Sequence, residues 1–122
     1  MASTSPYARQ FAETARLAAQ AAGHAAHLIA YQSAPSDSRV AWTGPDISEV
    51  VRAAAADGVQ DLLVQAAGFL VDHTEVLYDL DVEALAEANR LGVRFTRAAC
   101  VHDHPAFIQA LADGVAAALA RV

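Results

Sequence analysis

Cysteine and positive charge are both scarce in this sequence of 122 residues. A single cysteine, Cys100, excludes a disulfide within the chain and cannot supply the several thiolates of an iron–sulfur cluster. We therefore expect a reducing, cytoplasmic setting. The 8 Lys and Arg against 14 Asp and Glu give a net charge of −6, which disfavours nucleic acid as a partner and is compatible with a cationic ligand.

Long apolar runs are absent as well. None approaches the ~18–20 residues that span a bilayer, and the first ten residues lack the basic segment and apolar core of a secretory leader, so no stable membrane insertion is expected. Gly-rich phosphate motifs are missing, and Ser33 and Ser48 have no triad partners, which disfavours nucleotide-binding and hydrolase functions. A composition that is 55% hydrophobic and 18% charged predicts one globular domain over residues 1–122.

Apolar residues at helical spacing alternate along the chain with short apolar runs. Helices are expected from Ser5 to Gly23, from Ile47 to Gly58, from an N-cap at Asp72 to Gly92, and from Pro105 onward. In the last helix the residues expected to face inward are Phe107, Ile108, Leu111, Val115 and Leu119. Strands are expected over residues 27–33, 61–69 and 93–98. The alternation predicts an α/β fold with a doubly wound, mainly parallel sheet that binds ligands at the carboxyl ends of its strands.

Three carboxylates spaced four residues apart follow the second expected strand. They are Glu75, Asp79 and Glu83, which we call the acidic ridge. On a helix they lie along one side, where like charges repel by roughly 0.2–0.5 kcal/mol per pair. A solvated helix face is one explanation of this spacing. It is the explanation that suits Glu87, which follows Glu83 by a further four residues. A cation-binding surface is the other, since carboxylates suit labile, hard-to-borderline cations better than thiolates do.

Three segments resemble the carboxy-terminal half of the ferrochelatases, the enzymes that insert iron into a porphyrin. They are YQSAPSDSRVAWTGPD (31–46), GFLVDHTEVLYDLDVEAL (68–85) and, more loosely, HPAFIQAL (104–111). In the second segment Leu70 and Val71 replace the family's usual Val-Ser. The similarity runs from about Ser5 to the C-terminus and implies a chelatase-like domain equivalent to half a ferrochelatase.

The resemblance implies roles for particular side chains. Glu75 matches the catalytic-centre glutamate, which binds the incoming divalent ion, iron in the first place, and accepts pyrrole protons. Asp79 and Glu83 match acidic positions leading from that centre to the surface. Apart from the resemblance, His73 is a further candidate metal ligand by its residue type. Trp42 matches a tryptophan beside the porphyrin, so it is the candidate contact to a tetrapyrrole or other planar ligand. The implied activity is a ferrochelatase-type lyase reaction of heme biosynthesis.

Half of the family's architecture has no counterpart in these residues. The first α/β domain is missing, and so is the strand ahead of Ser5 that carries the family's catalytic histidine. We therefore expect the chain to form a homodimer or to pair with a complementary half-chelatase chain. Two alternatives to catalysis of metal insertion stay open. One is a non-catalytic metal- or tetrapyrrole-binding half of a complex, and the other is a half-chelatase recruited to a small-molecule reaction of specialised metabolism.

Several of the candidate side chains also have ordinary structural explanations. His73, in the first turn of a helix, can be a hydrogen-bonded structural group, and His104 can cap the last helix. Together with His102 it forms only a partial metal site. Trp42 can anchor its loop, and Cys100 can be a small core residue.

Overall fold

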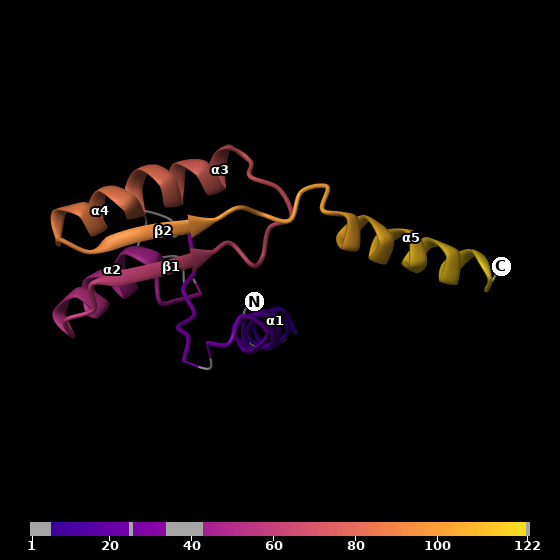
Figure 1. Cartoon of the computed structure of the whole chain (residues 1–122), viewed down its shortest axis with the longest axis horizontal. Coiled ribbons are helices and arrows are strands. Elements are labelled where there is room, and N and C mark those ends of the chain that lie inside the picture. Colours follow the sequence, from indigo (N-terminus) through magenta and orange to yellow (C-terminus); the bar gives the residue numbers. More distant parts are fainter. Residues whose placement is uncertain (1–5, 25, 34–42, 122) are drawn as a thin grey trace.

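The computed structural model describes residues 6–24, 26–33 and 43–121 (Figure 1). Its elements in chain order are α1 (Tyr7–Ala21), α2 (Ile47–Ala56), β1 (Asp61–Gln65), α3 (Thr74–Val76), the π-helix η1 (Leu77–Ala84), α4 (Leu85–Arg90), β2 (Arg94–Ala98) and α5 (Pro105–Leu119). No helix in this part of the chain has the length and apolar character needed to cross a membrane. The expected cap Ser5 and the expected ligand contact Trp42 lie outside the described residues.

The two strands run parallel, and the α3–η1–α4 run connects them, which confirms the predicted α/β class (Figure 1). Leu62 lies opposite Phe95 and Val64 opposite Arg97, and these four side chains are half-buried on the face that α2, η1 and α4 cover. The opposite face is open, with Leu63 70% exposed.

The core consists of two small apolar clusters between the helices and the covered sheet face. One contains Val51 of α2, Ala88 of α4 and Val93 before β2. The other contains Ala66, Val76, Leu80 and Cys100. Cys100 is therefore a buried core residue, as its structural explanation predicted, and burial raises the pKa of its thiol to about 11.

The strand expected over residues 27–33 does not form. Tyr31 makes only an isolated parallel bridge to Asp46, in which the Tyr31 N–H donates to the Pro45 carbonyl and the Ile47 N–H donates to the Tyr31 carbonyl, each at 2.8 Å. A strand requires a neighbouring strand to complete its backbone hydrogen bonds, and the described part of the chain supplies none alongside this segment. The first paired strand is also shorter than expected, because a turn at Ala67–Phe69 follows Gln65.

The helical run after β1 differs from the prediction at its start and in its middle. His73, rather than Asp72, is the N-cap of α3, since its Nδ1 accepts a hydrogen bond from the Val76 N–H at 3.5 Å. Asp72 is instead bound to residues that follow β2. The middle of the run is π-helical, a rare conformation that often lies at functional sites.

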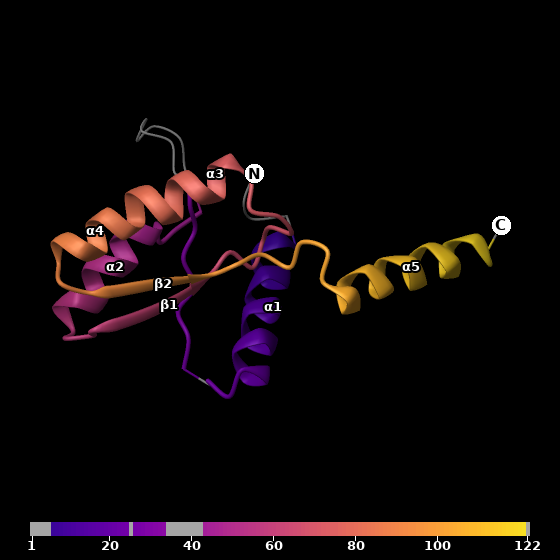
Figure 2. The same cartoon turned by 45° about the horizontal axis from the view of Figure 1, so that its top comes forward.

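α5 leads away from the sheet instead of packing on it (Figure 2). Of the side chains expected to face inward, Phe107 is half-buried and the other four are exposed by 49% to 68%. The inward orientation was therefore wrong: helical periodicity marks an apolar side, but it does not identify what covers that side. α1 also has no buried residue, although its Phe11 ring lies 5.5 Å from the Tyr31 ring.

Candidate functional site

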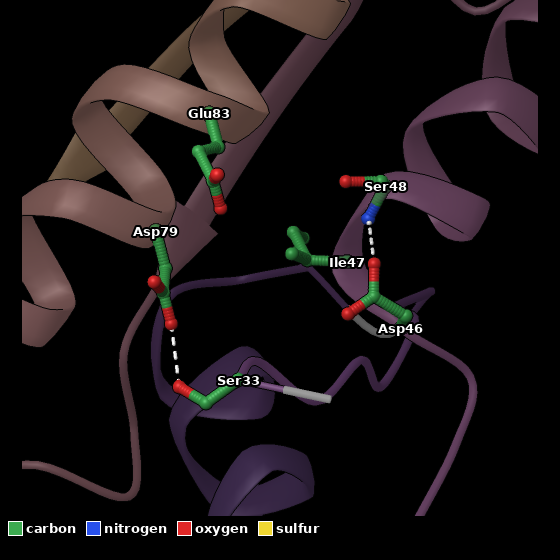
Figure 3. Close-up of a pocket in the computed structure, with 6 residues that line it drawn as sticks. All are labelled: Ser33, Asp46, Ile47, Ser48, Asp79 and Glu83. Carbon is green, nitrogen blue, oxygen red and sulfur yellow. Dashed lines mark hydrogen bonds between the residues drawn. The ribbon is translucent and has the colours of Figure 1, made fainter. Parts of the chain in front are cut away.

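The acidic ridge occupies one helical run, with Glu75 on α3 and both Asp79 and Glu83 on η1. Figure 3 shows Asp79 and Glu83 extending from this run towards the segment that ends at Ser33 and the start of α2. Asp79 is half-buried, while Glu75 and Glu83 are exposed. The ridge therefore forms one wall of a site whose other wall comes from earlier in the sequence.

Ser33 links two members of the ridge. Its hydroxyl lies within hydrogen-bonding distance of Glu75 Oε1 and of Asp79 Oδ2, and Gln32 Nε2 donates to the same Asp79 oxygen at 3.1 Å. A φ of 61° places Ser33 in the left-handed region, which is uncommon for a residue with a side chain and recurs at ligand-binding sites. Because a hydroxyl carries one proton, it satisfies one carboxylate at a time, and a cation between the two would relieve their repulsion.

A cavity of about 290 Å³ adjoins this contact (Figure 3). Its lining residues are Ser33, Asp46, Ile47, Ser48, Asp79 and Glu83. Asp46 is held in place because its Oδ1 accepts a hydrogen bond from the Ser48 N–H at 2.8 Å, while its own N–H donates to Glu49 Oε2 at 3.0 Å. This reciprocal pair is a capping box, and it starts α2 at Ile47.

The cavity lining is acidic. Three carboxylates and two hydroxyls contribute to it, and among the residues that the structure describes no Lys, Arg or His side chain does. Oxygen ligands of this kind suit hard divalent cations that retain part of their water shell. Within the described ranges, no three His, Cys, Asp or Glu side chains lie close enough together to hold a metal ion by themselves. The arrangement therefore suits a metal ion that is passing through the cavity. It also suits a bound ion whose remaining ligands are water molecules or groups of another molecule.

Asp72, next to the ridge in sequence, has a structural environment. Its Oδ1 accepts hydrogen bonds from Arg97 Nη1 at 2.8 Å and from the Cys100 N–H at 3.1 Å, and its Oδ2 lies 3.0 Å from His102 Nε2. These contacts, that of His102 first, hold the pKa of the Asp72 carboxyl far below its usual value. Arg97 also binds Asp81 on η1 at 2.6 Å, and this pair raises the pKa of the guanidinium. The network ties β2 to the turn that precedes the ridge.

The histidines are engaged in local structure. His73 caps α3 and packs edge-on against Phe69, with ring centroids 4.5 Å apart. His104 Nδ1 accepts a hydrogen bond from the Ala106 N–H at 3.3 Å and so caps α5, while His102 contacts Asp72. Metal ligation by His73 stays a prediction, and the geometry gives its Nδ1 another partner.

Glu87 belongs to an ion-pair group rather than to a bare solvated face. It binds Arg90 at 2.8 Å on the same helix and Arg52 of α2 at 3.3 Å, and its side chain is 18% exposed. Arg90, followed by Arg52, lowers the pKa of the Glu87 carboxyl to about 2. It therefore helps to hold α2 against α4 and lies apart from the cavity.

Sequence reasoning did not identify Gln32, Ser33 and Asp46 as neighbours of the ridge. The first two are polar positions at the start of the YQS segment, and the third ends its Gly-Pro-Asp. Their presence within a family-like segment was the available signal. The contacts of Gln32 and Ser33 with ridge residues more than 40 positions away could be found only from the fold, and so could the place of Asp46 in the lining of the same cavity.

Comparison with known proteins agrees with this architecture. The family model described as Ferrochelatase matches residues 1–119. Over 95% of its length the chain is 44% identical to a ferrochelatase of Thermus thermophilus, and over 75% it is 46% identical to a coproporphyrin III ferrochelatase of Propionibacterium freudenreichii. A coproporphyrin III ferrochelatase of Mycolicibacterium paratuberculosis is 40% identical over 88% of the chain.

The chain belongs to the ferrochelatase family. It is an α/β domain of that family, and the matched region covers 36%, 26% and 32% of the lengths of those three relatives. The resemblance drawn from its three segments is thereby confirmed at the level of the family.

Proposed function

We propose that this domain takes part in inserting a divalent metal ion into a tetrapyrrole, with iron as the primary candidate for the metal. The observation that carries the proposal is the contact of one hydroxyl, on Ser33, with two carboxylates, Glu75 and Asp79, beside an acidic cavity. Metal insertion needs groups that attract a divalent cation and groups that accept the two pyrrole protons it displaces. Carboxylates serve both purposes.

In this proposal each ridge residue has a separate task. Glu75, which is exposed and contacts the Ser33 hydroxyl, binds the incoming ion and takes a pyrrole proton. Asp79 and Glu83, which line the cavity, pass cations and protons between that point and solvent. Ser33 fixes the spacing of the first two carboxylates. Trp42 seats the macrocycle, and His73 is kept as a supplementary ligand that would have to exchange its helix-capping contact for a metal.

The described residues form only one side of a site for a macrocycle. The described chain offers one acidic wall and a cavity of about 290 Å³, near the lower limit of pockets for small ligands. We propose that a second copy, or a complementary half-chelatase chain, supplies the opposite wall and its proton acceptor. The buried thiol of Cys100 suits the reducing cytoplasm in which we place this reaction.

A non-catalytic role is the second candidate, and one observation favours it. Among the described residues no three potential ligands converge on a metal position. A domain of this kind would bind the ion or the tetrapyrrole and leave the chemistry to its partner. A third possibility is recruitment of the fold to another small-molecule reaction.

One experiment separates these functions. The purified chain is mixed with coproporphyrin III and Fe(II) or Zn(II), and metallation is followed by the absorbance change of the macrocycle. We expect metallation by the unmodified chain, its loss in Glu75→Gln, and its retention in Glu87→Gln, a matched change outside the cavity. Quenching of the single tryptophan, Trp42, by the macrocycle without metallation would identify the binding role. The absence of both quenching and metallation would favour recruitment to another reaction.

A further inference from the structure

The side chain of Arg97, on β2, binds two carboxylates that flank the first two ridge residues in the sequence. Its Nε and Nη2 donate to the two oxygens of Asp81 at 2.6 and 2.9 Å, and its Nη1 donates to Asp72 at 2.8 Å. Nη1 also lies 3.2 Å from the Ala98 carbonyl. All three nitrogens of the guanidinium are engaged, in a forked geometry that a lysine could not reproduce. We call Arg97, Asp72 and Asp81 the Arg97 network.

Little solvent reaches the centre of this network. The side chains of Arg97, Asp72 and Asp81 are exposed by 11%, 17% and 39%. Asp72 is fixed further by the Cys100 N–H at 3.1 Å and by His102 Nε2 at 3.0 Å. Charged groups in such surroundings keep one arrangement, because moving one of them leaves another without its partner. The guanidinium therefore fixes two points of the α3–η1–α4 run relative to β2.

The network holds the side of the run that faces away from the cavity. Asp81 lies two residues from Asp79 and two from Glu83, and residues at that spacing do not share a side of a helix. None of the three members of the network is among the residues that line the cavity. Both views show the helical run lying along β2 (Figures 1 and 2). The ridge therefore faces Ser33 on one side of the run, and the Arg97 network binds the other side to the strand.

The contacts between the ridge and the Ser33 segment do not by themselves fix where the ridge lies. The Ser33 hydroxyl contacts Glu75 and Asp79, and Gln32 donates to Asp79 at 3.1 Å. These donors belong to a segment that makes only an isolated bridge. β2, in contrast, is paired with β1 along its whole length. The firmest reference for the position of the ridge is therefore the strand that carries Arg97.

We propose that Arg97 is a positioning residue of the acidic ridge, which holds Glu75 and Asp79, by its grip on Asp81, at the spacing with which they take up a divalent cation. This role rests on the proposed function, because it concerns how the same ridge captures its metal ion. Arg97 itself contacts neither the ion nor the macrocycle. A displacement of about 1 Å in a positioned group is enough to lower a rate ~100-fold, so the hold on the ridge matters for uptake of the ion.

Charge and position predict opposite effects of removing Arg97. Loss of a positive charge behind the ridge would strengthen the attraction of a cation. Loss of the anchor would let the ridge shift and would weaken uptake. Removal of Asp81 has the reverse effect on charge and the same effect on position. A pair of variants, Arg97→Leu and Asp81→Ala, therefore separates the two explanations.

The first test follows the metallation of coproporphyrin III by Zn(II) with the full chain. Arg97→Leu and Asp81→Ala should each raise the KM for Zn(II) at least about tenfold and leave the KM for the macrocycle unchanged. A smaller folded fraction alone would lower kcat and change neither KM. The double variant should be no worse than Arg97→Leu, because the two residues act as a pair. Arg94→Leu, which removes the same charge from an exposed pair on the same strand, is the control and should change neither KM.

Three results of this test would overturn the proposal. The first is a pair of opposite shifts in the KM for Zn(II), which would identify an effect of charge. The second is an unchanged KM for Zn(II) in both variants, which would leave Arg97 a purely structural role. The third is a double variant whose loss equals the product of the two single losses, since the two residues would then act independently.

The second test measures the binding of Mn(II) without a macrocycle, by electron paramagnetic resonance of the free ion. Mn(II) prefers oxygen ligands, so it reports on the ridge carboxylates rather than on the histidines. The dissociation constant should rise about tenfold or more in Arg97→Leu and Asp81→Ala and stay the same in Arg94→Leu. Arg97→Lys keeps the charge and the fold but holds its carboxylates with a point charge, so it should also raise the constant. An unchanged constant in both Arg97 variants would overturn the proposal.

The two tests together distinguish failure of the positioning role from failure of the proposed function. Binding of Mn(II) by the unmodified chain without metallation would contradict the proposed function, and the Mn(II) affinities of the variants would then decide the role of Arg97. Metallation with unaltered affinities in the variants would contradict the positioning role alone. An unmodified chain that binds no Mn(II) would overturn both.

Discussion

The Ser33 hydroxyl contacts the Asp79 carboxylate across 46 positions of sequence. This contact joins the end of the bridged segment at Tyr31 to the π-helical part of the run, and it brings a family-like YQS segment against the acidic ridge. The left-handed backbone of Ser33 aims its side chain at the ridge. The contact therefore makes Ser33 the residue most informative about whether the ridge functions as a unit.

Ser33→Ala removes the hydroxyl and leaves Glu75 and Asp79 facing each other without a shared donor. We expect metallation to fall about tenfold, because the two carboxylates lose their fixed spacing, while stability changes by no more than about 1 kcal/mol, the net value of one hydrogen bond. Metallation kinetics and urea unfolding measure the two effects. Ser48→Ala, which lines the same cavity without touching the ridge, is the control; equal losses in both variants would refute a special role for Ser33.

Glu75→Gln should abolish metallation while preserving the fold. The change retains the shape of the side chain and removes its charge and proton-accepting capacity. Because like charges on one helical side repel, the variant should also be slightly more stable, by roughly 0.2–0.5 kcal/mol. Asp79→Asn should reduce metallation less, since water can bypass a relay group. A destabilisation of Glu75→Gln above ~1 kcal/mol would indicate that the carboxylate is structural.

Glu87→Gln is expected to show the reverse pattern. Glu87 joins Arg52 of α2 to Arg90 of α4, so its neutralisation should lower the midpoint of urea unfolding and leave metallation unchanged. The carboxyl pKa of about 2 adds a pH signature. The stabilisation is complete above the unfolded value of ~4.3 and is lost as pH falls towards 2, so the variant and the unmodified chain should converge in acid. Loss of metallation in this variant would extend the functional ridge beyond Glu83.

Asp72 should dominate the acid unfolding of the domain. Its contacts to His102, Cys100 and Arg97 hold its pKa far below the unfolded value of ~3.9. A carboxyl with a depressed folded pKa contributes stability that is present above the unfolded pKa and is lost as pH falls through the folded pKa. Unfolding midpoints measured from pH 6 downward should therefore fall steeply below about pH 4. Asp72→Asn should be less stable at pH 6 and should flatten that decline, and an unchanged slope would contradict the assignment.

Sequence patterns predicted the local elements well and the long-range contacts poorly. The spacing of Ile47 and Val51 gave α2, and the apolar runs gave β1 and β2, because these features depend on neighbouring residues. The segment at residues 27–33 failed as a strand because pairing depends on a distant chain segment. The inward side of α5 failed for the same reason. Gln32 and Ser33 joined the site only through contacts that no spacing rule contains.

Arg97 and Arg94 offer a paired test of which ion pairs stabilise the fold. Both lie on β2, but Arg97 is 11% exposed between Asp72 and Asp81, whereas the Arg94–Asp61 pair is 77% and 62% exposed. Arg97→Leu leaves two acidic groups without their shared cation, and we expect a loss on the order of 1–3 kcal/mol, since solvent still reaches Asp81. Arg94→Leu should change stability very little, because water already screens its pair. Urea unfolding of both variants gives the comparison. Equal losses would show that the Arg97 network does not hold β2 to the turn before the ridge, and the position of Asp72 would then need another explanation.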